Sequence, residues 1–351
     1  MAALKASLRE EGLDGYIVSN EANILYLTGF LGGVRLLIPE EGENHLYVYG
    51  VNYESAKRTA KNCGVELVER RGDTDMRIAD LVRGLRLGRV GFDIMEASVY
   101  LKLAEALKDV RLNPRGKLLW RLREVKDEEE LKCMRRAAEL TSEGVKTAFE
   151  TVRSGLREYE LAAEIEYAMR RMGSEGVAFD TIVASGVRSA FPHGGCTDRK
   201  IRKGDLVLID VGAKYRHYRA DLSRTVAVGK PSPEQKKIHE TVREAHQKVL
   251  EILRAGVKAC DADAVARGLI SGKGYGGYFV HSLGHGVGLD VQEPPALSQE
   301  NEEALRAGNV VTVEPGIYLA GFGGVRVEDT VLVLEDGAER LTTAPYALEV
   351  E

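Results

Sequence analysis

The chain has 351 residues, of which 44% are hydrophobic and 29% charged, enough for about two ordinary domains with buried cores. Its formal net charge of -5 argues against sequence-independent nucleic-acid binding, which needs a basic surface. No apolar run approaches the ~18 residues that span a bilayer, and residues 1–10 lack an apolar h-region, so we expect no secretory signal. The four cysteines are isolated, so we expect reduced thiols and a cytoplasmic protein with no membrane partner.

The N-terminal third of the chain alternates strand and helix patterns. We expect strands at residues 15–19, 32–38, 46–49, 65–68 and 89–93. Helices are expected at residues 4–11, 53–62 and 76–87. Such alternation is typical of an α/β domain with a layered sheet.

A highly charged run, residues 121–130, ends this part of the chain. Its acidic stretch at 127–130 suits the first turn of a helix, where the helix dipole stabilises negative charge. We therefore expect a solvent-exposed helix start there. The run is also the best domain boundary, between a domain at residues 1–122 and a second at 123–351.

The second domain has long helical patterns and glycine-rich strand patterns. Helices are expected at 128–152, 157–172 and 233–253, and strands at 179–184, 206–212, 221–228, 310–316 and 325–332. One arrangement occurs twice. An acid, Asp210 or Glu314, follows β-branched residues, a glycine stands two residues later, and a second acid, Asp221 or Glu328, comes with the next strand. The repeat predicts a pseudo-symmetric domain with facing carboxylates.

These four carboxylates lie beside apolar strand residues. Burying an unpaired carboxylate costs several kcal/mol, and converging carboxylates raise each other's pKa values. A bound cation removes both conflicts. The alternative is four exposed strand-end or salt-bridge residues, which is the usual situation for a single acid but explains two similar units poorly.

Two histidines, His281 and His285, stand four residues apart in a glycine-rich segment. Glycines permit close backbone approach, so these histidines are candidate site residues rather than isolated polar ones. One imidazole with four carboxylates suits Mn, Fe or Co better than a structural zinc site, which favours Cys and His.

In their order and spacing these residues resemble the pita-bread metallopeptidases, the family of prolidase, aminopeptidase P and methionine aminopeptidase. Asp210 and Asp221 are followed by His285 in His-Gly-Val-Gly, Glu314 in Val-Glu-Pro-Gly and Glu328 in Val-Arg-Val-Glu-Asp. Residues 23–30, Asn-Ile-Leu-Tyr-Leu-Thr-Gly-Phe, are similar to a signature of the creatinase/prolidase N-terminal domain, which methionine aminopeptidases lack. The resemblance implies an α+β chain in which a pita-bread catalytic domain follows an α/β creatinase-type N-terminal domain.

The resemblance also implies two divalent metal ions per subunit, Mn, Co, Fe or Zn. Asp210 would bind one ion, Asp221 and Glu328 would bridge both, and His285 and Glu314 would complete the second site. Glu314 would also take the proton of a water between the ions and pass it to the departing nitrogen.

Other matched positions would contact the substrate. His281 would stabilise the tetrahedral intermediate. His193, in Phe-Pro-His-Gly, would lie near the substrate's C-terminal side as a catalytic and binding residue, and Arg326 would meet a carboxylate. Gln292 stands where the family usually has His, and Gln cannot carry a positive charge. A tolerated exchange and an altered substrate range both fit this departure.

The resulting hypothesis is a homodimeric dipeptidase that hydrolyses the Xaa-Pro bond with a metal-bridging hydroxide. Aminopeptidase P, which acts on longer Xaa-Pro peptides, would share every catalytic residue. A creatinase-like hydrolase and an inactive binding relative are further alternatives, although the full ligand set argues against both.

Overall fold

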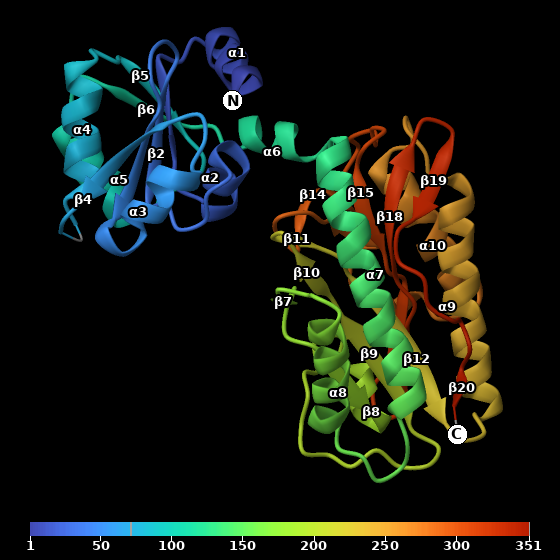
Figure 1. The fold of residues 1–351 in the computed structure, drawn as a ribbon. Helices are drawn as coiled ribbons and strands as arrows, with labels where there is room; N and C mark the ends of the chain where they lie inside the picture. Colours follow the sequence, from blue (N-terminus) through green and yellow to red (C-terminus); the bar gives the residue numbers. More distant parts are fainter. Residues whose placement is uncertain (71, 351) are drawn as a thin grey trace. The chain divides into compact units, whose positions relative to one another are not determined.

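The computed structural model describes residues 1–70 and 72–350. The chain forms two compact units, Met1–Arg123 and Glu124–Glu351 (Figure 1). Among the described residues, no helix is long and apolar enough to cross a membrane.

The N-terminal unit is built on one six-stranded sheet in the order β4-β3-β2-β1-β5-β6. The pairs β1–β2 and β2–β3 are antiparallel and the other pairs are parallel. Its strands are β1 (Gly15–Val18), β2 (Arg35–Pro39), β3 (His45–Tyr49), β4 (Gly64–Val68), β5 (Arg89–Phe92) and β6 (Arg111–Pro114). Its helices are α1 (Ala2–Glu11), α2 (Glu21–Thr28), α3 (Gly50–Thr59), α4 (Thr74–Gly84), α5 (Ala97–Ala106) and α6 (Lys117–Arg123).

Helices cover both faces of this sheet. Successive strand side chains point to opposite faces, so Tyr16 and Val18 pack with α1, α2, α3 and α6, whereas Ile17 packs with α4 and α5. The predicted layered α/β domain is confirmed. Helix α2 contains residues 23–28 of the segment 23–30 and was not expected as a helix. Most of its residues are buried, so its sequence shows no one-sided helical periodicity.

The charged run at residues 121–130 contains the predicted helix start. Helix α7 (Glu128–Thr151) begins there, and the Asp127 side chain accepts hydrogen bonds from the Glu129 and Glu130 amides. The Glu130 carboxylate in turn accepts one from the Asp127 amide, which completes a capping box.

The prediction that this run is solvent-exposed is wrong for Arg123, Lys126 and Glu130, which are all buried. Each has a polar partner far away in the sequence, which a local charge pattern cannot reveal. Arg123 donates to Asn23, Lys126 lies 3.3 Å from a carboxylate oxygen of Glu293, and Glu130 accepts from the hydroxyl of Tyr218.

The C-terminal unit contains two main sheets, β20-β12-β9-β8 and β14-β13-β15-β18-β19, and the smaller sheets β11-β10-β7 and β16-β17. The first half comprises α7, α8 (Glu158–Arg171), β7 (Gly176–Val177), β8 (Ile182–Ser185), the 3-10 helix η1 (Gly186–Ala190), β9 (Leu206–Val211), β10 (Ala213–Tyr215), β11 (Tyr218–Arg219) and β12 (Leu222–Val228). The second comprises α9 (Pro233–Ile252), α10 (Ala259–Gly272), η2 (Gly276–Tyr278), β13 (Gly284–Gly286), β14 (Glu293–Leu297), β15 (Val310–Val313), β16 (Gly316–Leu319), β17 (Gly323–Arg326), β18 (Asp329–Leu334), β19 (Gly337–Arg340) and β20 (Glu349–Val350).

The two halves repeat one plan, as the sequence predicted. Each begins with two helices, which pack on the main sheet of that half. Each sheet has a central antiparallel pair, β9–β12 or β15–β18, and a short hairpin, β10–β11 or β16–β17, connects the two strands of the pair. Figure 1 shows the long helices α7 and α9 lying outside these sheets.

Several strand limits differ from the prediction. The strand expected at 325–332 is two strands, β17 and β18, with Val327 and Glu328 between them. Likewise β8 begins at Ile182 rather than 179, β12 begins one residue after Asp221, and β15 ends one residue before Glu314. Val327 is fully buried, so the apolar pattern continues through the break and conceals it. Asp221, Glu314 and Glu328 therefore each lie next to the end of a strand rather than within one.

Candidate metal centre and active site

Asp210 is placed by the alternation of side chains along β9. Its neighbours Ile209 and Val211 belong to the apolar cluster under α7 and α8. Asp210 therefore points to the opposite face of the sheet, the side on which Leu208 packs with Tyr318.

Ser and Thr hydroxyls join the two halves of the unit at the acids. The Thr330 hydroxyl accepts from the Asp221 amide at 3.0 Å and donates to the Asp221 carbonyl at 2.7 Å. The Glu328 amide donates to the Ser223 carbonyl at 3.1 Å, and the Ser223 hydroxyl donates to the Glu328 carboxylate at 2.6 Å. These bonds hold Asp221 of one half beside Glu328 of the other.

Three carboxylates therefore form one buried cluster. Oxygens of Asp210, Asp221 and Glu328 lie within 4.8 Å of one another, and these residues are only 8%, 5% and 1% exposed. Burial, reinforced by the neighbouring carboxylates, raises the pKa of Asp221 and of Glu328 far above the usual carboxyl range. One oxygen of each acid has no hydrogen-bond partner among the described residues. Hard divalent cations prefer such oxygens, so the residues fit a metal.

His285 and Glu314 extend this cluster. His285 Nε2 lies 3.4 Å from a Glu314 oxygen and 3.9 Å from an Asp221 oxygen. His285 Nδ1 lies 2.9 Å from the Gly286 carbonyl, which can only accept, so the proton belongs on Nδ1 and the Nε2 lone pair faces the acids. Thr312 fixes both residues, because its hydroxyl accepts from the His285 amide and donates to Glu314.

A cavity of about 230 Å³ opens over this cluster, and all nine site residues expected from the sequence line it. They are His193, Asp210, Asp221, His281, His285, Gln292, Glu314, Arg326 and Glu328. Phe179, Ile182, Pro192 and Val291 supply an apolar wall. His193 and Gln292 are exposed, whereas Arg326 is almost wholly buried. The structure thus brings the predicted residues together in one cavity.

Tyr318 and Ser223 take part in the site although sequence reasoning missed them. The Tyr318 hydroxyl lies 2.9 Å from both His281 Nε2 and Arg326 Nη1. Arg326 also donates to Asp210 and, through Nε, to the Ser223 hydroxyl at 2.9 Å. Ser223 stands two residues after Asp221, a spacing that could have placed both on one face of a strand. In the sequence Tyr318 looks like an ordinary core aromatic, and no motif marks it as a site residue.

The fold and this cavity define a pita-bread enzyme of the metallopeptidase class, and comparisons with known proteins give the family. Residues 132–335 match the model of metallopeptidase family M24, and residues 1–125 match the creatinase/prolidase N-terminal domain. The chain belongs to metallopeptidase family M24 and is a peptidase. Its N-terminal unit is the creatinase/prolidase domain that precedes the catalytic one.

Named relatives include more than one kind of peptidase. The Xaa-Pro dipeptidase of Pyrococcus furiosus is 39% identical over 95% of this chain and 94% of that protein. The prolidase structure from Pyrococcus horikoshii OT3 has a TM-score of 0.93 and 38% identity, covering 98% of each chain. The X-Pro aminopeptidase structure from Thermotoga maritima has a TM-score of 0.92 and the same 38% identity, covering 100% of this chain and 99% of that one.

The segment that brings His193 to the cavity is anchored by Glu158, at the start of α8. The buried Glu158 carboxylate accepts from the amides and hydroxyls of Ser185 and Thr197, at 2.6 to 3.0 Å, and from Arg188. Arg188 also donates to the Gly194 carbonyl, next to His193. Burial alone would raise the pKa of Glu158, but the bonds from Thr197, Ser185 and Arg188 outweigh it and hold the pKa below its usual value.

We predict that Glu158→Gln destabilises the protein by about 2 kcal/mol at pH 7, because a neutral amide replaces an acceptor of charge-assisted bonds. A lowered folded pKa stabilises the protein above the unfolded pKa of about 4.3, and this contribution disappears as the pH falls through the folded pKa. The difference between wild type and variant should therefore shrink in acid. Urea unfolding at several pH values measures it. The control is Glu164→Gln, which changes an exposed residue of α8. If Glu158→Gln and wild type were equally stable at pH 7, Glu158 would not anchor the segment that carries His193.

Proposed function

We propose that this enzyme is a dinuclear-metal dipeptidase that hydrolyses Xaa-Pro bonds. The observation that carries the proposal is the cluster of Asp210, Asp221 and Glu328, each of which has one buried oxygen without a hydrogen-bond partner among the described residues. His285 and Glu314 extend this cluster. The five oxygen and nitrogen ligands around one cavity would suit two ions, and Asp221 and Glu328 would bind both. Mn, Co, Fe and Zn all accept such ligands.

Two divalent ions bound here would supply Lewis acidity and lower the pKa of a water held between them. Glu314 can take that water's proton, since its carboxylate faces His285 at the edge of the cluster. The nitrogen of an Xaa-Pro bond carries no hydrogen and must be protonated before it leaves. Glu314 is placed to return the proton to it.

His281 is the proposed partner of the carbonyl oxygen. Its Nδ1 lies 2.8 Å from the Ser282 carbonyl, and its Nε2 faces the Tyr318 hydroxyl. Burial lowers the pKa of His281, so the resting ring is neutral. Negative charge growing on a substrate oxygen favours uptake of a proton from solvent by Nε2, which would then donate to that oxygen.

The rest of the cavity supports a short, proline-containing substrate. The apolar wall of Phe179, Ile182, Pro192 and Val291 can pack against a pyrrolidine ring and an apolar Xaa side chain. We assign His193, Arg326 and Gln292 to the substrate's C-terminal side. Several relatives carry the names prolidase or Xaa-Pro dipeptidase, and family resemblance also suggests a homodimer, which light scattering would test.

Aminopeptidase P activity is the second candidate, favoured by the equal identity to the Thermotoga maritima X-Pro aminopeptidase. The two activities differ in the group after proline, which is a free carboxylate in a dipeptide and a neutral amide in a longer peptide. Parallel turnover of Ala-Pro and Ala-Pro-Ala, with Ala-Ala as the control, separates the candidates. Hydrolysis of Ala-Ala alone would contradict both.

The proposal predicts strict metal dependence. Chelation should abolish turnover and Mn or Co should restore it, because the chain's own groups provide no other nucleophile in the proposed mechanism. Asp221→Ala or Glu328→Ala should lose both ions together, as measured by elemental analysis of reloaded protein. Full turnover in metal-free protein would overturn the proposed mechanism.

His281→Ala should bind metal normally but lose roughly 10² to 10³ in turnover, the usual cost of removing one oxyanion donor. Steady-state kinetics on reloaded protein gives the turnover number, and elemental analysis gives the metal content. His217→Ala, in the β10–β11 turn and outside the cavity lining, is the matched control. An unchanged turnover number would exclude the assigned role.

Gln292→His should favour dipeptides over tripeptides. Below about pH 7 an imidazole of ordinary pKa ~6.5 is partly charged, and hydrogen bonds to charged groups are worth about 1.5 to 3 kcal/mol against 0.5 to 1.5 for neutral ones. The Michaelis constant for Ala-Pro should therefore fall in mild acid while that for Ala-Pro-Ala changes little. If the ratio of the two efficiencies is the same in wild type and variant at pH 6 and pH 8, Gln292 does not face the carboxylate.

A further inference from the structure

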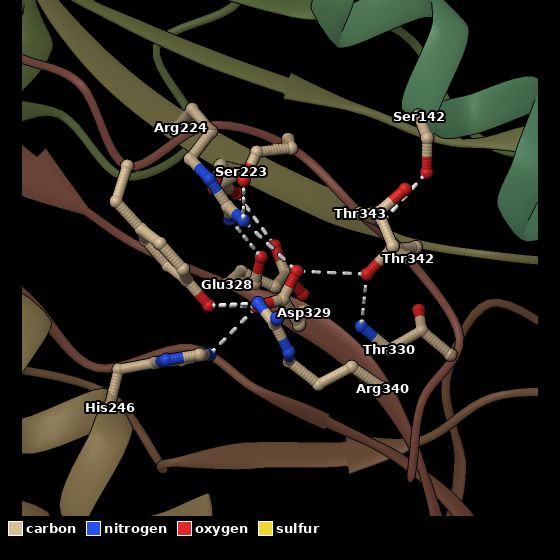
Figure 2. A network of polar contacts seen from close by, with 12 residues as sticks. Ser142, Ser223, Arg224, His246, Glu328, Asp329, Thr330, Arg340, Thr342 and Thr343 are labelled. Atoms are coloured by element: carbon tan, nitrogen blue, oxygen red, sulfur yellow. Dashed lines mark hydrogen bonds and ion pairs between the residues drawn. The ribbon is translucent and has the colours of Figure 1, made fainter.

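A second polar cluster surrounds Asp329, the residue after Glu328 (Figure 2). Asp329 is fully buried and does not line the cavity. Its carboxylate accepts from Arg224 Nη2 at 3.1 Å, from the Thr342 hydroxyl at 3.0 Å and from the Tyr346 hydroxyl at 2.8 Å. Donors from two distant parts of the chain, strand β12 and the C-terminal segment 342–346, therefore converge on one carboxylate.

Arg224 connects this cluster to the metal-centre backbone. Its Nη1 donates to the carbonyls of Ser223 at 3.0 Å and Glu328 at 2.6 Å. Its Nε donates to the Pro345 carbonyl at 3.0 Å, and its Nη2 donates to the Ala344 carbonyl at 3.1 Å as well as to Asp329. These five bonds match the five N–H donors of a guanidinium, so the side chain has one fixed position.

Thr342 links Asp329 to the main chain at Asp221. Besides donating to Asp329, its hydroxyl accepts from the Thr330 amide at 3.0 Å. The Thr330 hydroxyl in turn bonds both the amide and the carbonyl of Asp221. Asp329 is therefore linked to the main chain at both Asp221 and Glu328.

Of the ionisable side chains around Asp329, Arg224 is the buried one that is charged at neutral pH, so it is the counter-ion of Asp329. His246 Nε2 lies 3.3 Å from an Asp329 oxygen, but burial lowers the pKa of His246 to about 4, so its ring is neutral at neutral pH. Burial and the Asp329 charge raise the pKa of Tyr346 to about 12, so its hydroxyl keeps the proton that it donates. Arg340 lies 3.5 Å from Asp329 but is partly exposed.

A buried ion pair contributes little net stability compared with apolar residues of similar volume, because both charges lose their hydration. What the pair Asp329–Arg224 supplies is fixed geometry. When both are ionised, Asp221 and Glu328 repel each other, and a mobile backbone would let them separate. Residues that orient ligands in this way typically change metal affinity by 10- to 100-fold when they are mutated.

We infer that Asp329 is a positioning residue of the metal centre. Paired with Arg224, and joined by Thr342 and Tyr346 to the C-terminal segment 342–346, it holds the main chain at Asp221 and Glu328 in the arrangement that binds metal. The inference rests on the proposed function in one respect, that Asp221 and Glu328 are metal ligands.

The test is Mn²⁺ affinity of the full-length protein, measured by calorimetry after chelation, at a temperature where circular dichroism shows each variant to be folded. Asp329→Asn should weaken binding by about 10- to 100-fold, and excess Mn²⁺ should restore the turnover number without a change in Michaelis constant. Glu339→Gln is the matched control. Glu339 lies on β19, next to β18, and its carboxylate pairs with Arg135 of α7 rather than with a residue of the Asp329 cluster. The control should bind Mn²⁺ as wild type does.

Two milder variants keep the inference testable if Asp329→Asn does not fold. Tyr346→Phe removes one donor to Asp329, and Thr342→Val removes one donor to Asp329 together with the acceptor of the Thr330 amide. Neither variant changes the charge, and each should weaken Mn²⁺ binding by a smaller factor, below about 10-fold. Wild-type affinity in folded Asp329→Asn, or in both milder variants, would overturn the positioning role. Absence of Mn²⁺ binding by the wild type would instead overturn the proposed function, so the two failures are distinguishable.

Discussion

Repulsion among three buried carboxylates is the constraint on which the catalytic unit depends. Asp210, Asp221 and Glu328 have oxygens within 4.8 Å of one another and are almost completely removed from water. Without a cation the cluster must take up protons, which is the meaning of the raised pKa values of Asp221 and Glu328. Holding these groups together in their ionised form therefore costs free energy that a bound metal would return, and the surrounding fold has to resist their separation.

The repeated architecture explains how the fold provides that resistance. Each half contributes an antiparallel strand pair with acids at corresponding positions, and the helices pack on the face opposite the acids. Hydroxyls of Ser223 and Thr330 join the halves where Asp221 and Glu328 meet. Behind them, the fully bonded guanidinium of Arg224 ties the Glu328 carbonyl to the C-terminal segment. Rigid main chain thus places side chains that would otherwise move apart.

Much of this arrangement could be predicted from the sequence. The spacing of the acids predicted the two-fold plan, and one cavity is lined by every expected site residue. The family comparisons confirm the pita-bread fold with its creatinase-type N-terminal domain. What the sequence concealed were interactions between distant segments. Buried Lys126 and Glu130 looked solvated because their partners lie elsewhere in the chain, and Tyr318 looked like a core aromatic. The break at Glu328 was hidden because buried Val327 continues the apolar pattern.

The most direct test of the account is anomalous diffraction from crystals of the protein loaded with Mn²⁺, recorded on both sides of the manganese edge. The account predicts two anomalous peaks in the cavity, roughly 3.5–4 Å apart, with the carboxylates of Asp221 and Glu328 between them and Asp210 bound to one. A cavity without an anomalous peak, or a single ion bound away from Asp221 and Glu328, would contradict it.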